Sequence, residues 1–222
     1  TVPARWSREN LPVRTPVFGL ARYDAAGQLD SAFGSGGKLT LSFAQPITNG
    51  PGADFAVFEN GITDEFLELA FVEVSSDGVN FVRFPSVSLT PANVQIGTFG
   101  SLDPTNLHNL AGKYRTGFGT PFDLAELAGN PLLNLGSILQ VRVIDVVGSV
   151  ARNSQTLEYW YGRFDSRGNV INDPWTTPFE TSGFDLDAIG VFHQVPEPGT
   201  ALLLGLGAVL LGSRRRAARK TG

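Results

Sequence analysis

The chain has 222 residues, of which 42% are hydrophobic and 17% are charged, and 26 Gly and 14 Pro interrupt it, so we expect one main domain built from short segments. It has no Cys, which excludes disulfides, thiolate catalysis and cysteine-ligated metals. Five positive charges lie between residues 214 and 220; without them 12 basic residues face 21 acidic ones, a net charge of −9 that disfavours nucleic-acid binding.

Strand patterns recur after an irregular segment at residues 1–33. In residues 38–43 polar and apolar residues alternate, which places Leu39, Leu41 and Phe43 on one face. The sequence Ser76-Asp77-Gly78 separates two later patterns and predicts a hairpin turn with a positive φ at Gly78. The other predicted strands are residues 55–58, 67–75, 80–84, 141–147 and 184–192.

A short helical signal lies at residues 121–128, where Thr120 or Asp123 could cap one or two turns. Long amphipathic helices do not separate the strand patterns, which disfavours a parallel β-α-β architecture. We therefore predict an all-β fold, an antiparallel β-sandwich over residues 34–194. The long irregular stretches at residues 97–119 and 152–182 are where we expect any binding surface.

Residues 195–222 form a tail of three parts. The first is the motif Val195, Pro196, Glu197 and Pro198, whose prolines favour extended backbone that a processing enzyme can reach. An apolar run follows, and then a basic cluster that would hold the far end of the run on the cytoplasmic side of a membrane. The expected anchor residues are Leu202, Leu203, Leu204, Leu206, Val209, Leu210 and Leu211, and the basic cluster is Arg214, Arg215 and Arg216.

The apolar run is predicted to be a C-terminal helix that holds the membrane weakly. About 14 residues rise only about 21 Å in a helix, against a hydrocarbon core of about 30 Å. Such a short anchor suits a temporary hold. The alternative is a buried core helix, which the length of the run also permits.

The order of Pro-Glu-Pro, apolar segment and arginine cluster resembles the PEP-CTERM sorting signal. The resemblance implies export, with a transient anchor in the inner membrane of a Gram-negative bacterium. It further implies cleavage near Pro196 and Pro198 by an exosortase-type membrane protease, and delivery to the cell envelope or to an extracellular polysaccharide matrix.

The region upstream resembles a family of uncharacterised bacterial surface proteins from about Gly34 to His193. The segments that carry this resemblance are residues 50–60, 71–81, 109–113 and 183–189. It implies a jelly-roll or galactose-binding-like sandwich without an assigned activity. Residues 23–38 resemble one copy of a short repeat found in large bacterial surface proteins, and one copy does not establish a repeat architecture.

Several carboxylates fall inside these segments. If residues 184–189 are extended, alternation places Asp185 and Asp187 on one face, where they repel each other. A Ca²⁺ ion would offset this repulsion, with Asp54, Glu59 or Asn60 as the further oxygen ligands. The alternative is that these acids cap turns, pair with basic residues or face solvent.

Aromatic residues gather in the second irregular stretch, at Tyr159, Trp160, Tyr161 and Trp175. Exposed aromatic rings bind the apolar faces of sugars, so these residues form a hypothetical glycan site. The alternative is that they cover one end of the core.

The sequence contains neither a Gly-x-Ser-x-Gly elbow nor a phosphate-binding loop with Lys and Ser or Thr. We therefore predict a non-enzymatic surface or matrix protein that binds glycan or calcium. The alternative is a secreted carbohydrate-active hydrolase that uses paired carboxylates as acid and base.

Overall fold

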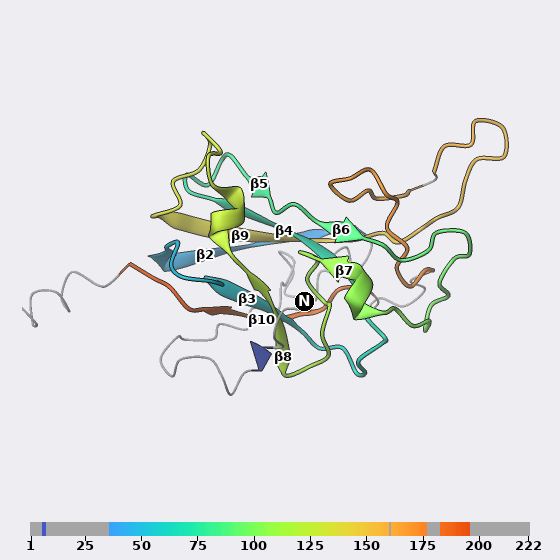
Figure 1. Ribbon diagram of the computed structural model, residues 1–222, viewed down its shortest axis with the longest axis horizontal. Helices are drawn as coiled ribbons and strands as arrows, with labels where there is room; N and C mark the ends of the chain where they lie inside the picture. The colour runs from blue at the N-terminus through green and yellow to red at the C-terminus, as the bar shows by residue number, and fades with distance from the viewer. Residues whose placement is uncertain (1–5, 8–35, 160, 177–182, 196–222) are drawn as a thin grey trace, which may run out of the picture.

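The computed structural model describes residues 6–7, 36–159, 161–176 and 183–195, and this part is mostly β structure in antiparallel sheets (Figure 1). One sheet has the order β1 (Trp6–Ser7), β8 (Phe118–Phe122), β3 (Phe55–Glu59), β10 (Leu186–Val191). The other has the order β2 (Lys38–Ile47), β9 (Ile138–Asp145), β4 (Ala70–Ser75), β5 (Val82–Arg83). A third, two-stranded sheet pairs β6 (Val87–Ser88) with β7 (Leu107–His108), and the short 3-10 helices are η3 (Pro104–Asn106) and η4 (Leu124–Leu127).

The two four-stranded sheets lie in layers and share one hydrophobic core (Figure 1). Phe55 and Val57 of β3 belong to this core, whereas Ala56 and Phe58 belong to a separate cluster, as expected when successive side chains of a strand point to opposite faces. Leu41 is in the shared core, and Leu39 and Phe43 pack against it. The shared face predicted for these three residues is therefore confirmed. From the second sheet the core also receives Ala70, Val72, Val74, Ile138, Val141 and Val143.

The predicted turn between β4 and β5 is confirmed. Gly78 has a φ of 77°, and the Asp77 carboxylate accepts hydrogen bonds from the backbone N–H groups of Val79 and Asn80, each at 2.8 Å. These bonds reverse the chain locally, so β4 and β5 pair as antiparallel neighbours. The turn depends on residues adjacent in sequence, which is why the sequence alone predicted it.

The segment predicted as a helix at residues 121–128 divides into two elements. Its first two residues end β8, and the helical turn is η4, capped by Asp123, whose carboxylate accepts from Ala125 N at 2.8 Å. The strand β8 was not predicted from the sequence, because Gly and Pro weaken an isolated strand. Pairing with β1 and β3 on its two sides holds it in place, and a Cβ at Gly119 would come within 2.8 Å of the Phe58 ring.

The last described residues form backbone hydrogen bonds with residues at the end of β2. Thr48 N donates to His193 O at 3.0 Å, and Val195 N donates to Pro46 O at 3.0 Å. The apolar helix predicted over the tail lies outside the described residues. Within the described residues, no helix combines the length and apolar character that crossing a membrane requires.

Candidate functional site

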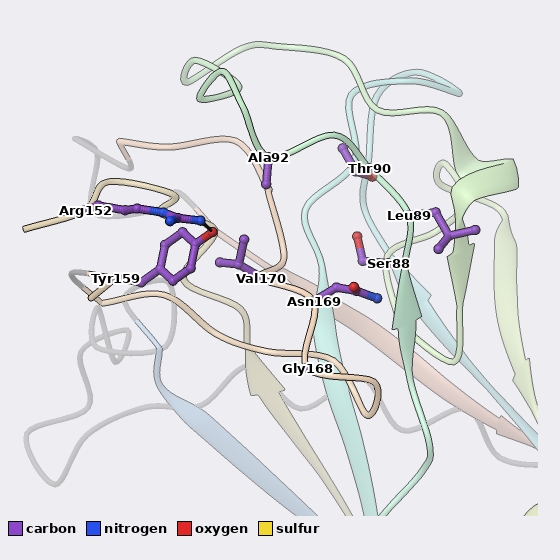
Figure 2. Close-up of a pocket in the computed structure, with 9 residues that line it drawn as sticks. All are labelled: Ser88, Leu89, Thr90, Ala92, Arg152, Tyr159, Gly168, Asn169 and Val170. Atoms are coloured by element: carbon purple, nitrogen blue, oxygen red, sulfur yellow. Dashed lines mark hydrogen bonds between the residues drawn. The ribbon is translucent and has the colours of Figure 1, made fainter. Parts of the chain in front are cut away.

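A pocket of about 540 Å³ opens among the loops beside β6 (Figure 2). Three segments that are distant in sequence form it: β6 with the loop after it, the strand-like pair around residues 152 and 159, and the turn that precedes residue 170. The residues that line it are Ser88, Leu89, Thr90, Ala92, Arg152, Tyr159, Gly168, Asn169 and Val170.

A buried carboxylate joins two walls of this loop pocket. Asp165 is 6% exposed, and its Oδ2 accepts from Ser88 N and from Asn169 Nδ2, each at 2.9 Å. Its Oδ1 accepts from Arg167 N and Asn169 N, each at 2.8 Å. Burial acts to raise the pKa of Asp165, but these hydrogen bonds prevail and hold the pKa below its ordinary value. An ionised Asp165 therefore fixes the turn against β6.

A buried amide fixes the loop after β6. Asn172 is fully buried, and its Nδ2 donates to Pro91 O at 2.7 Å and to Val94 O at 2.8 Å. Its Oδ1 accepts from Ile96 N at 3.1 Å. This loop carries Thr90, so a second wall of the pocket is held in place before any ligand arrives.

The third wall is built on Tyr159. The Arg152 guanidinium lies 4.2 Å from the centre of the Tyr159 ring, and its Nη2 donates to the Tyr159 hydroxyl (Figure 2). The Phe164 ring contacts Tyr159 edge to face, with 5.6 Å between ring centres. These two contacts fix the Tyr159 ring at the side of the pocket.

The pocket combines apolar surface with hydrogen-bonding groups. Leu89, Val170 and Tyr159 supply carbon surface. The hydroxyl oxygens of Ser88 and Thr90 have no hydrogen-bond partner among the described residues. Both oxygens are buried, so a ligand in the pocket does not reach them, and the exposed side chains of Arg152 and Asn169 supply the accessible hydrogen-bonding groups. This composition is typical of sites for small polar molecules with an apolar face.

The structure brings one of the predicted aromatic residues into this pocket, Tyr159. Tyr161 is 69% exposed and is not among the lining residues, and Trp175 is half-buried with its backbone N–H bonded to Ile96 O. Trp160 lies outside the described residues. Sequence reasoning missed Arg152, Ser88, Thr90 and Asn169, because three separate segments supply them; the turn signal of residues 165–169 could have indicated one wall.

A second polar feature is a cluster of carboxylates, which we call the acid cluster: Glu59, Glu68, Asp145, Asp173 and Asp185. Burial is the main cause that raises the pKa of Glu59 to about 8, of Glu68 to about 7 and of Asp145 to about 6, and repulsion from Asp185 raises all three further. The pKa of Asp173 is raised well above its ordinary value, chiefly by burial. Protons are therefore retained in this cluster near neutral pH.

Hydrogen bonds satisfy the acid cluster only in part. Glu59 Oε2 accepts from Gly61 N at 2.7 Å, and Asp173 Oδ2 accepts from Leu69 N at 3.0 Å. The other oxygen of each carboxylate is buried without a hydrogen-bond partner among the described residues. Glu59 is 1% exposed and Asp173 is 3% exposed, so water does not reach these oxygens. Such unpaired oxygens favour the neutral, protonated acid.

The structure brings only part of the predicted calcium set together. Glu59 and Asp185 interact electrostatically, but Asp54 lies before β3 whereas Glu59 ends it. The Asp54 carboxylate accepts from Gly50 N and Leu124 N, each at 2.7 Å. A bulge between Leu186 and Ala188 interrupts the alternation that predicted a shared face for Asp185 and Asp187. In the part of the chain that the structure describes, no group of three or more acidic or histidine residues is arranged to hold a metal ion.

Comparison with known proteins identifies the tail. Residues 194–216 match the family described as the PEP-CTERM protein-sorting motif, at the position predicted from the sequence. The chain thus carries the C-terminal, membrane-associated sorting signal of an exported protein, and this motif implies an exosortase-type processing partner. No curated protein and no solved structure matches the chain.

Proposed function

We propose that this exported chain is the precursor of a cell-surface or matrix protein whose β domain binds a carbohydrate in the loop pocket. The domain is proposed to be a sandwich of the jelly-roll or galactose-binding-like kind, since two antiparallel sheets share one core. Its destination is proposed to be the envelope or polysaccharide matrix of a Gram-negative bacterium, because the sorting motif at residues 194–216 supports export.

Processing is proposed to occur directly after the folded domain. The apolar run holds the precursor in the inner membrane until a protease cleaves near Pro196 and Pro198. Val195, the last residue that the structure describes, donates its backbone N–H to Pro46 O of β2, and it is also the first residue of the motif. Mass spectrometry of the extracellular protein should give a C-terminus near the proline pair and no peptide from residues 214–220. Recovery of the intact tail outside the cell would contradict this.

The observation that supports carbohydrate binding is a preformed pocket with a mixed lining. Asp165 and Asn172 fix two walls from buried positions, so little ordering entropy is lost when a ligand binds. The apolar face of a sugar fits against exposed carbon surface such as Leu89, while its hydroxyls reach the exposed Asn169 side chain.

A matched pair of tyrosine variants tests the pocket. Tyr159→Ala removes a lining ring, and Tyr161→Ala removes an exposed ring that does not line the pocket. On an array of bacterial polysaccharide fragments, we expect the parent chain and Tyr161→Ala to bind alike and Tyr159→Ala to lose about tenfold or more in affinity. Equal losses in the two variants would place binding elsewhere, and an array without any bound fragment would refute the proposal.

Cation binding by the acid cluster is a second candidate, supported by the unpaired oxygens of Glu59 and Asp173. Ca²⁺ prefers oxygen ligands and would take the place of the retained protons, once the carboxylates draw together around it. The melting temperature at pH 8 should then rise with added Ca²⁺, and Glu59→Gln should abolish the rise. An unchanged melting temperature in the parent chain would contradict calcium binding, and the retained protons would then be what neutralises the carboxylates.

The hydrolase alternative stays a prediction. It requires two carboxylates that a sugar can reach, and Glu59, which interacts with Asp185, is 1% exposed. Turnover of a polysaccharide by the parent chain, abolished in Asp185→Asn, would favour this alternative over a binding protein.

A further inference from the structure

The loop pocket contains a cation whose hydrogen-bonding capacity is largely unused. Arg152 is exposed, lines the pocket and is held by its stacking contact with Tyr159 (Figure 2). A guanidinium has five N–H donors in a planar fork, and the hydrogen bond to the Tyr159 hydroxyl uses one of them. Across residues 36–159, 161–176 and 183–195, Arg152 forms no ion pair.

Two carboxylates that adjoin lining residues of the pocket have other partners. Both oxygens of Asp165 accept two hydrogen bonds each, from β6 and from their own turn. Glu158 lies next to Tyr159 in sequence and accepts from Thr156 Oγ1 at 3.4 Å. Neither carboxylate forms an ion pair with Arg152 in the described part of the chain, so the positive charge at the pocket is left for a ligand.

We propose that the sugar bound in the loop pocket carries a carboxylate, as in a hexuronic acid residue, and that Arg152 is the residue that selects it. This inference rests on the carbohydrate binding proposed above. The guanidinium fork matches the two oxygens of a carboxylate, and such paired, charged hydrogen bonds are about twice as strong as neutral ones. The sugar hydroxyls remain free to reach the exposed Asn169 side chain.

The acidic character of the rest of the chain does not oppose this selection strongly. Repulsion between an anionic sugar and distant carboxylates is screened over about 8 Å at physiological ionic strength. The stacked guanidinium contacts the ligand directly and is screened much less. Local geometry, not net charge, therefore decides which sugar binds.

The test compares acidic sugars with their neutral esters. Tetramers of galacturonate, glucuronate and mannuronate, and the methyl ester of each, are titrated calorimetrically into the 222-residue chain in an uncharged polyoxyethylene detergent. We expect at least one acid to bind about tenfold more tightly than its own ester. Equal affinity for every acid and its ester overturns this inference but leaves the pocket function standing, whereas binding of none of the six sugars overturns both.

Two arginine variants locate the selectivity. Arg152→Gln should bring the acid and ester affinities to within about twofold while leaving ester binding in place. Arg167→Gln removes an equal charge from the neighbouring turn at an exposed residue that does not line the pocket, and it should keep the preference. A preference that survives Arg152→Gln, or that falls equally in both variants, overturns the assignment to Arg152. Unchanged melting temperatures confirm that both variants fold.

Discussion

Two buried carboxylates in this protein, Asp165 at the loop pocket and Glu59 in the acid cluster, have pKa values that are shifted in opposite directions. Asp165 is 6% exposed and has a pKa below its ordinary value, whereas Glu59 is 1% exposed and has a pKa raised to about 8. Asp165 accepts four hydrogen bonds, and its turn fixes a pocket wall. Glu59 accepts one from Gly61 N and interacts with other carboxylates. Burial alone therefore does not set the charge of a carboxylate; its hydrogen bonds and neighbours decide it.

The difference also separates two roles. An ionised carboxylate that accepts hydrogen bonds at both oxygens holds the segments that it bonds rigidly together, because its charge makes each hydrogen bond stronger. A buried carboxyl group that retains its proton is compatible with the folded state only at pH values that keep it neutral. The pocket should thus be robust to pH where the acid cluster is not.

The largest effect we expect is a loss of stability as pH rises. The raised pKa values of Asp145, Glu68 and Glu59, about 6, 7 and 8, mean that the folded chain binds more protons than the unfolded chain between about pH 4 and pH 8. Stability is therefore fully present below this window and is lost across it, by an amount on the order of 5 kcal/mol between pH 5 and pH 9. Urea unfolding at a series of pH values measures this, and a flat or rising profile would contradict it.

The next effect concerns the Asp165 carboxylate, which holds its turn against β6 at the pocket. Asp165→Asn keeps the shape of the side chain but puts an NH₂ group where N–H donors point, so we expect a loss of about 3 kcal/mol in the free energy of unfolding and a loss of sugar binding. Asp103→Asn is the control, because Asp103 is an exposed carboxylate that caps η3. If both variants lose the same free energy of unfolding, Asp165 does not hold two segments of the pocket together as proposed.

A third prediction tests the acid cluster directly. Glu59→Gln mimics the protonated acid, with an oxygen left for Gly61 N and an amide that can donate to the neighbouring carboxylates. We expect the variant to exceed the parent by about 2 kcal/mol at pH 9 and to differ little at pH 5. Glu65→Gln, an exposed residue, changes the net charge equally and should show no such pH dependence. A difference that is the same at both pH values would argue against a retained proton at Glu59.

The smallest effect should come from Asp77, where the contribution of hydrogen bonds can be measured without burial. Its carboxylate also accepts several hydrogen bonds, and they lower its pKa, with the Asn80 side chain contributing most. Water can replace these bonds because the turn is open to solvent. Asp77→Ala should therefore lower the urea midpoint clearly less than Asp165→Asn does. An equal or larger shift would mean that burial adds nothing at Asp165.

The parts of the fold that were predicted correctly depend on neighbours in sequence. Gly78 takes a positive φ because its own turn requires it, and Asp123 caps a turn that begins with the next residue. Alternation placed Leu39, Leu41 and Phe43 on the core face, because the period of a strand is a property of its own backbone. β8 was missed because its stability comes from the strands on either side of it.

The candidate sites were predicted only in fragments. Tyr159 was chosen as an aromatic residue in a long loop, but the pocket around it also needs Ser88 and Asn169. The Asp165 carboxylate bonds both of them, and it lies 77 residues from Ser88 in sequence. Asp185 and Glu59 were expected to lie close together, and they do interact. Their partners Glu68, Asp145 and Asp173 were not expected in this set, because tertiary contacts, not spacing along the chain, bring them there.

The local turns, the β character and the sorting tail follow from the amino-acid sequence alone, since each depends on a short run of residues whose backbone preferences, polarity or order act without help from the rest of the chain. Folding in three dimensions sets which carboxylates lie together, where the bulge at Asp187 shifts the strand, and which loops enclose a pocket. The reason is that burial and electrostatic interactions depend on distance in space, and folding brings together residues that the sequence keeps far apart.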